Sequence, residues 1–112
     1  MEGNRLATEL NRDNYDSETL QAKGRVLVDF WGEQCAPCKA LLPTVEGLEN
    51  DYAGKIKVGK VDAPKNRMLC ARLRVFGLPT FILYQDGVEN KRLSGEKVTA
   101  KELKAAVEAM FV

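Results

Sequence analysis

The sequence contains no histidine and only three cysteines among its 112 residues. A structural zinc site takes about four cysteine or histidine ligands, and an iron–sulfur cluster needs a similar set, so this chain cannot build either centre alone. An odd number of cysteines also argues against a framework of structural disulfides and suits a reducing compartment. We therefore expect a protein that is held together by one hydrophobic core and binds no metal.

An excess of charge of one sign is also lacking, because 17 basic and 16 acidic residues leave a net charge of +1. No basic stripe interleaved with aromatic residues is present, so we expect no nucleic-acid partner. The apolar runs are far shorter than a membrane span, and the first residues lack the basic start and apolar stretch of a secretory signal. The sequence therefore predicts a cytoplasmic protein without a membrane partner.

The length predicts a single domain, because a chain of this size buries roughly two-thirds of its unfolded surface in one core. Hydrophobic residues make up 45% and charged residues 29% of the chain, as in ordinary globular domains. No internal repeat, low-complexity tract or linker interrupts the sequence. We expect one domain over residues 1–112, with polar residues 1–5 as a loose extension, and a monomer, as is usual for so small a domain.

The pattern of apolar residues predicts strands that alternate with helices. Strands are expected at 26–31, 55–62, 80–84 and 88–93, with a short strand or turn at 6–10. Strands that are joined through helices pair in parallel. The last two strands flank Gln85–Gly87, which is typical of an antiparallel hairpin. The expected fold class is therefore α/β, with a central mixed sheet and helices on both of its faces.

Capping residues and apolar periodicity place the helices between these strands. They are expected at 16–22, capped by Asp16 and Ser17, from the segment after Cys38 to Gly54, at 66–73, capped by Asn66, and after the capping box Thr99–Glu102. Pro43 lies inside the second helix, where it removes one hydrogen bond and crowds a carbonyl. We therefore expect a kink there.

The most informative feature is the pair Cys35 and Cys38, which follows the apolar run 26–31 directly and is separated by Ala36 and Pro37. The cysteines stand where a buried strand ends and a helix begins. Unpaired N–H groups and the helix dipole stabilise a thiolate at that end, which lowers its pKa and makes it a nucleophile near neutral pH. Two cysteines at this spacing can also form a disulfide with each other. The sequence therefore predicts a site that makes and breaks one S–S bond.

Other uses of the cysteine pair are less favoured. Covalent haem attachment needs a histidine after Cys38, where Lys39 stands, and an inert disulfide would close a loop of only two intervening residues. By position Cys35, nearer the free helix end, is the expected attacking thiolate. Cys38, one turn further in, is the expected buried thiol that resolves the mixed disulfide.

Asp29 interrupts the apolar strand 26–31. An edge carboxylate that faces water is one interpretation. Apolar residues on both faces of the strand favour the other, in which the whole strand is buried. A buried carboxylate has a raised pKa and can carry protons, so Asp29 is a candidate for proton transfer.

Further motifs extend the pattern around the cysteine pair. They are Val28–Trp31, Cys35–Lys39, Pro43, Lys60–Asp62, Gly77–Thr80, Asp86–Gly87 and Gly95. With the predicted order of elements, these motifs make residues 10–112 resemble the thioredoxin family. A Cys-x-x-Cys alone is a weak signal, but a strand aspartate before it and a Pro-Thr about 40 residues after it make the resemblance specific.

The resemblance implies the thioredoxin fold and a thiol–disulfide oxidoreductase that reduces protein disulfides. It implies that no bound cofactor is needed and that a separate thioredoxin reductase supplies the electrons. The aspartate that matches Asp29 lies beneath the resolving cysteine and helps to deprotonate it. Lys60 matches a lysine near that aspartate.

The resemblance also assigns the substrate surface. Pro79 matches a proline whose peptide bond is cis and which faces the dithiol, whereas its place at a strand start would by itself indicate a trans proline. The backbone around Leu78 would then offer its N–H and C=O to an extended substrate. The surface that contacts the substrate would comprise Trp31, Ala36, Pro37, Phe76, Gly77, Leu78 and Gly95.

Three positions depart from the family pattern. Gln34 stands where a second tryptophan is usual, Ala36 replaces a glycine, and Pro64 stands where many members have an aspartate. Gln34 puts a family-like substrate range in question, and Gln34 and Ala36 leave a second hypothesis open, a more oxidising oxidase or isomerase. A thioredoxin-like binding module in a larger assembly is a third, against which the intact cysteine pair and Asp29 argue.

Cys70 is the third cysteine, and it lacks the position at a helix N-terminus that Cys35 and Cys38 have. It lies within a short helix, away from the helix N-terminus and from the other cysteines. We favour a packed or idle thiol, and the alternative is a regulatory or intermolecular thiol.

Overall fold

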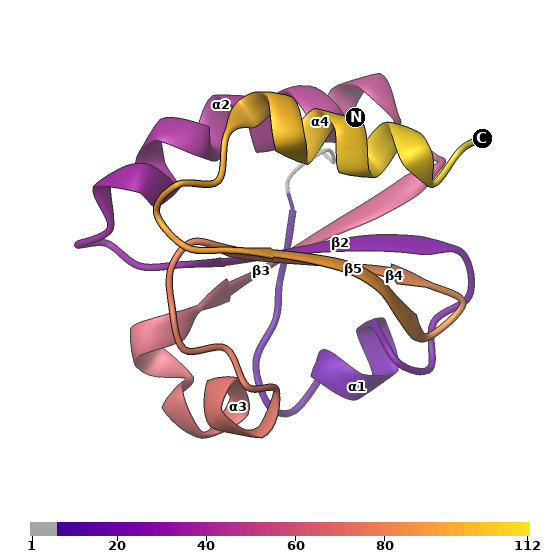
Figure 1. Ribbon diagram of the computed structural model, residues 1–112. Coiled ribbons are helices and arrows are strands. Elements are labelled where there is room, and N and C mark those ends of the chain that lie inside the picture. The colour runs from indigo at the N-terminus through magenta and orange to yellow at the C-terminus, as the bar shows by residue number, and fades with distance from the viewer. Residues whose placement is uncertain (1–6) are drawn as a thin grey trace.

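The computed structural model describes residues 7–112, which form one mixed sheet in the order β1-β3-β2-β4-β5 (Figure 1). The strands are β1 (Thr8–Glu9), β2 (Arg25–Trp31), β3 (Ile56–Asp62), β4 (Thr80–Gln85) and β5 (Val88–Ser94). β3 pairs in parallel with β1 and β2, whereas β4 is antiparallel to both β2 and β5. The predicted α/β mixed sheet is confirmed. The loose extension expected at residues 1–5 lies outside the described residues.

Helices cover both faces of the sheet. In Figure 1, α2 (Ala36–Asp51) and α4 (Ala100–Ala109) lie on one face, and α1 (Tyr15–Glu18) and α3 (Arg67–Arg72) lie on the other. A short 3-10 helix, η2 (Ala63–Lys65), links β3 to α3. No helix among residues 7–112 has the length and apolar character needed to span a membrane.

The central strand β2 is buried on both faces, because it contributes to two separate cores. Leu27 packs with α2 and α4 in a cluster that includes Val45 and Val107. Val28 and Phe30 pack on the opposite face. Alternate side chains of a strand point to opposite faces, so the face of Leu27 is also the face of Asp29.

The start of α1 differs from the sequence prediction. The helix runs from Tyr15 to Glu18, so Asp16 lies inside it and does not cap it. The turn before the helix is held by Asn11, whose side-chain oxygen accepts the N–H groups of Asp13 and Asn14 at 2.8 and 3.2 Å. This turn starts the helix one residue earlier, and the predicted extent of 16–22 is wrong.

The cap of α3 is also different from the prediction. Asn66 stands at the capping position, but its side-chain amide donates to the carbonyl of Asp62 at 2.9 Å and accepts no N–H from the helix. The side chain therefore fastens η2 to the end of β3. The predicted capping role of Asn66 is wrong, although the helix begins next to it.

Two local predictions near the C-terminus are confirmed. The hydroxyl oxygen of Thr99 accepts the N–H of Glu102, and the Glu102 carboxylate accepts the N–H of Thr99 in return, as a capping box requires. The hairpin turn is formed by Asp86 and Gly87, with φ values of 51° and 84°. Positive φ at both central residues matches the twist of the flanking strands. The predicted kink at Pro43, inside α2, stays a prediction.

Candidate active site

The cysteine pair lies where β2 ends and α2 begins. Cys35 is the N-cap residue of α2, and its sulfur accepts the N–H of Cys38 at 3.2 Å. Pro37 lies in the first turn, where its missing N–H leaves no helix hydrogen bond unmade. A disulfide joins Cys35 and Cys38, whose Cα atoms are 5.3 Å apart. The sulfur of Cys35 therefore occupies the place where a helix N-terminus stabilises a thiolate.

The two cysteines differ in their access to solvent. Cys35 is half-buried, whereas Cys38 is only 6% exposed. An incoming disulfide therefore meets the sulfur of Cys35 first. Cys38 lies behind it, inside the protein.

Asp29 is a buried carboxyl group in the middle of β2. Its side chain is 3% exposed, and within the described residues its Oδ1 atom accepts no hydrogen bond. Burial raises the pKa of Asp29 to about 7, and the nearby charge of Lys60 opposes this rise more weakly. Lys60 is the register partner of Asp29 on β3. The carboxyl group is therefore poised to gain or lose a proton near neutral pH.

A cavity of about 440 Å³ is shared by the carboxyl group of Asp29 and by Cys38. It is lined by Asp29, Trp31, Cys38, Lys39, Leu42 and Lys60. The structure thus brings together three of the residues that the sequence singled out for chemistry, Asp29, Cys38 and Lys60. The volume exceeds the share of a single water molecule in the liquid, about 30 Å³, so water can link these groups.

Sequence reasoning missed two residues of this cavity, Lys39 and Leu42. Leu42 lies four residues after Cys38 in α2, which places the two side chains on the same helix face. That spacing was the available signal. The spacing of Cys38 and Leu42 does not by itself show that this face of α2 covers Asp29, because the contact depends on how α2 packs on β2.

The loop at Pro79 is fastened to the end of β5. The Leu78–Pro79 peptide bond is cis, and the carbonyl of Pro79 accepts the N–H of Gly95 at 2.8 Å. The hydroxyl of Thr80 donates to the carbonyl of Gly77 at 2.6 Å. Gly77, Leu78 and Gly95, which were all expected at the substrate surface, are therefore held close to one another.

The loop before Cys35 packs against the Pro79 loop. A Cβ atom placed on Gly32 would lie 3.3 Å from the Leu78 side chain and 3.4 Å from that of Pro64. The N–H of Cys35 donates to the carbonyl of Gly32 at 3.1 Å. Since Gly32 touches both neighbours so closely, the cysteine pair, η2 and the Pro79 loop form one continuous region.

The other residues expected at the substrate surface differ in exposure. Ala36 is exposed, Pro37 and Trp31 are half-buried, and Phe76 is 82% exposed. Trp31 lines the Asp29 cavity, whereas Phe76 lines a second cavity of about 390 Å³ beside α3. Cys70 is a free thiol with 8% exposure on the wall of that second cavity, and burial raises its pKa.

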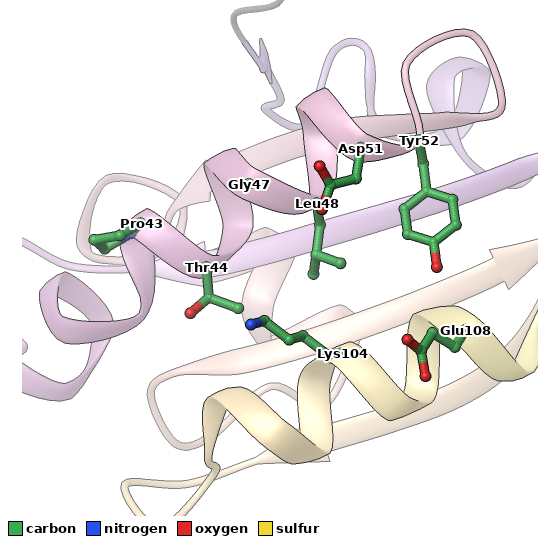
Figure 2. Close-up of a pocket in the computed structure, with 8 residues that line it drawn as sticks. All are labelled: Pro43, Thr44, Gly47, Leu48, Asp51, Tyr52, Lys104 and Glu108. Carbon is green, nitrogen blue, oxygen red and sulfur yellow. The ribbon is translucent and has the colours of Figure 1, made fainter.

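A larger cavity of about 670 Å³ lies between α2 and α4 (Figure 2). Figure 2 shows Lys104 reaching from α4 towards Thr44 of α2, with Asp51 and Glu108 further along the two helices. Neither cysteine of the pair and no part of Asp29 lines it. The hollow is therefore separate from the candidate active site.

Comparison with known proteins gives matches over nearly all the described residues. The family model described as thioredoxin matches residues 7–109. A thioredoxin of Acetoanaerobium sticklandii is 42% identical over 99 residues, which cover 88% of this chain and 94% of the relative. A thioredoxin of Peptoclostridium acidaminophilum is 35% identical over 102 residues, with coverages of 91% and 93%. Thioredoxin C-2 of Corynebacterium nephridii is 40% identical over 75 residues, with coverages of 67% and 69%.

Proposed function

The chain belongs to the thioredoxin family, and from that premise we propose how its residues divide the work of reducing a protein disulfide. It is a thiol–disulfide oxidoreductase with the Cys35–Cys38 pair as its redox centre. The observation that carries the proposal is the pair itself, with Cys35 accessible at the start of α2 and Cys38 buried behind it.

In the first step, the thiolate of Cys35 attacks one sulfur of the substrate disulfide. A bond forms between Cys35 and that sulfur while the substrate S–S bond breaks, and the departing substrate thiolate takes up a proton. The half-buried position of Cys35 and the N–H groups at the start of α2 support its role as the attacking group. The product is a mixed disulfide between protein and substrate.

In the second step, Cys38 releases the substrate. The carboxylate of Asp29 accepts the thiol proton of Cys38 through the cavity that both residues line, and Lys60 limits how far the pKa of Asp29 rises. The Cys38 thiolate then attacks the sulfur of Cys35, which forms the Cys35–Cys38 disulfide and expels the second substrate thiolate. Two electrons have passed from the dithiol to the substrate.

The Pro79 loop is the proposed binding place for the substrate backbone. The N–H and C=O groups around Leu78 would pair with an extended segment, and Trp31, Pro37 and Phe76 would contact its side chains. Family membership implies disulfide-bearing protein substrates and a reductase partner in general. We also propose that a dedicated thioredoxin reductase is the electron donor. The protein would act in the cytoplasm as a monomer, with a single thioredoxin domain over residues 1–112.

The first test is the reduction potential of the Cys35–Cys38 pair, measured by equilibration with defined dithiol and disulfide buffers. A value near the thioredoxin potential of about −270 mV is expected for a reductant. A value between about −180 and −120 mV would instead favour an oxidase or isomerase. Gln34 precedes Cys35, and Ala36 lies between the two cysteines. Replacing Gln34 by the usual tryptophan, or Ala36 by the usual glycine, would show which residue causes a more oxidising reduction potential.

A second test separates the roles of the two cysteines. Cys38→Ser should accumulate the mixed disulfide, because the attacking thiol remains and the resolving thiol is gone. Mass spectrometry after incubation with a disulfide substrate measures the adduct. Cys35→Ser should form none, and Cys70→Ser should behave as the wild type. An absence of adduct in Cys38→Ser with every substrate tried would contradict the assignment.

A further inference from the structure

The distribution of charge around α3 is one-sided. Between Asp62 and Asp86 the chain carries four basic residues and no acidic one, although the whole chain is almost neutral. The four are Lys65, Arg67, Arg72 and Arg74. They belong to η2, to α3 and to the residues that follow α3. This stretch of the sequence therefore carries a local excess of basic residues that the total charge conceals.

Two of these cations are already paired and two are not. Arg72 forms an ion pair with Asp16 at 2.9 Å, and Lys65 lies 3.9 Å from the carboxylate of Asp62. Arg67 and Arg74 are exposed, and neither forms an ion pair within residues 7–112. Both guanidinium groups are thus available to an acidic partner, for which their fork of donors is well suited.

Two large apolar side chains near Arg67 are exposed to solvent. Phe76 is 82% exposed and Met68, within α3, is 77% exposed. Phe76 lines the cavity of about 390 Å³ together with Arg67, Cys70 and Leu78, whereas Met68 lines a neighbouring hollow together with Arg67 and Asp13. An exposed aromatic ring at the edge of a hollow is costly to leave in water and is typical of a contact surface.

This surface continues directly into the active site. Leu78 forms part of the hollow and precedes Pro79, and Pro64 lines the hollow as well. Both side chains approach Gly32, in the loop that leads to Cys35. A polypeptide held along the Pro79 loop with its disulfide at Cys35 would therefore place neighbouring residues over α3.

Arg74 occupies a backbone conformation that usually belongs to glycine. Its φ is 59°, its N–H donates to the carbonyl of Ala71, and the N–H of Val75 donates to the carbonyl of Cys70 at 2.8 Å. These bonds close the C-terminus of α3, and glycine is the residue that makes such a turn without strain. Glycine can therefore replace Arg74 without strain, so the role of the arginine side chain can be tested at this position.

We propose that Arg67, Arg74, Met68 and Phe76, which we call the α3 surface, bind an acidic and apolar segment of the substrate polypeptide beside its disulfide. The inference rests on the proposed function and names a substrate class for the same site. Carboxylates of the substrate would pair with the two arginines, and an apolar side chain would enter the hollow against Phe76. Substrates with acidic residues next to the reactive disulfide are therefore reduced in preference to neutral ones.

Two synthetic peptides test the preference. Each carries the same disulfide and one leucine, with three glutamates beside the disulfide in the first peptide and three glutamines in the second. The pre-reduced protein is mixed with each peptide without a reductase, and the second-order rate constant of this single turnover is measured. We expect the acidic peptide to be favoured about tenfold at low ionic strength, and the ratio to fall towards one at high salt, because salt screens exposed charge pairs.

Matched variants identify the surface. Arg67→Gln combined with Arg74→Gly should bring the ratio between the peptides close to one. Glycine suits the positive φ of residue 74, so the urea midpoint of this variant should not fall because of that change. The control is Lys101→Gln with Lys104→Gln, which removes two exposed cations from α4 and should leave the tenfold ratio intact.

Each other outcome overturns a defined part of the argument. Equal rates for both peptides, or a ratio that survives in the double arginine variant, would remove the acidic preference while leaving disulfide reduction in place. An equal loss in the lysine control would show an effect of total charge alone. If the arginine variant lost only reductase-coupled turnover, the surface would bind the reductase and not the substrate. Failure to reduce either peptide would instead remove the proposed function.

Discussion

The two faces of the sheet differ in whether a buried polar side chain has a hydrogen-bond partner. On the face of α1 and α3, the hydroxyl groups of Tyr15 and Tyr84 form a hydrogen bond of 2.7 Å inside the core. On the face of α2, Asp29 is equally buried, but its Oδ1 atom has no partner in the described part of the chain. One face therefore holds a satisfied polar pair, and the other holds an unsatisfied carboxyl group beside a cavity.

The two faces therefore differ in whether their buried polar groups can change protonation state near neutral pH. Burial raises the pKa values of both tyrosines, so the pair stays neutral and inert at every physiological pH. Burial raises the pKa of Asp29 to about 7, which makes its proton easy to gain or lose near neutrality. A group that lacks a partner is costly to keep, and its retention next to Cys38 fits the role proposed for it.

The largest expected effect is that of Asp29 on stability as a function of pH. The pKa of Asp29 is about 7 in the folded protein against an ordinary 3.8, so the folded state holds a proton that the unfolded state releases. The free energy of unfolding should therefore fall as the pH rises from about 4 to about 7, and then level off. At 1.36 kcal/mol per pKa unit the full loss is on the order of 4 kcal/mol.

Asp29→Asn should remove this dependence and make the protein more stable than the wild type above pH 7. Urea unfolding at several pH values between 4 and 8 measures the effect. Asp51→Asn is a suitable control, because Asp51 is exposed at the other end of α2. It should keep the wild-type dependence. The comparison between the two faces breaks down if Asp29→Asn and the wild type lose stability equally with rising pH.

Some of these structural features can be predicted from the sequence, and others cannot. The burial of Asp29 can be predicted, because it interrupts a strand whose neighbours are apolar on both faces. The hairpin at Asp86–Gly87 and the capping box at Thr99–Glu102 can also be predicted, since each depends on residues close together in the chain. Local interactions of this kind can be predicted from the types and the spacing of a few neighbouring residues.

Interactions between distant residues are less visible in the sequence. Tyr15 and Tyr84 are 69 residues apart, and nothing in either segment indicates that their hydroxyl groups meet. Asp16 and Asn66 looked like helix caps, but each binds another partner. The Asp16 carboxylate accepts from Arg72, 56 residues away, and the Asn66 amide donates to the carbonyl of Asp62, four residues before it. Side chains that can cap a helix also bind elsewhere, so tertiary neighbours decide the outcome.

The tyrosine pair gives the second prediction, of intermediate size. Tyr15→Phe leaves the hydroxyl of Tyr84 buried without its partner, which should lower the free energy of unfolding by about 1–3 kcal/mol. The double variant Tyr15→Phe with Tyr84→Phe should recover most of this loss, because no orphaned hydroxyl remains. Urea unfolding of the wild type, both single variants and the double variant provides the double-mutant cycle.

The same variants should leave disulfide reduction unchanged at a pH where all remain folded. The tyrosine variants would then change stability alone. Replacement of Asp29, in contrast, is expected both to slow the release of substrate and to stabilise the fold. A double tyrosine variant that is no more stable than the single ones would show that the pair is held by packing and not by the hydrogen bond.

Leu42 gives the third prediction, which concerns the wall of the Asp29 cavity. Burial is the leading cause of the raised pKa of Asp29, and the apolar side chain of Leu42 lines the cavity beside the carboxyl group. Leu42→Ala should admit more water and lower the pKa of Asp29 by up to about one unit, which is about 1.4 kcal/mol. Titration of the side-chain carboxyl carbon of Asp29 by NMR measures the shift, and the pH midpoint of substrate release should move with it.

Leu73→Ala is the matched control for this cavity, because Leu73 is also half-buried but packs on the face of α1 and α3. Loss of packing alone would destabilise both variants to a similar degree, whereas only Leu42→Ala should change the titration of Asp29. If both variants leave the pKa of Asp29 near 7, Leu42 is part of the core and has no influence on proton transfer. If both lower it, the carboxyl group responds to general loosening of the fold, and the special character of the α2 face would be refuted.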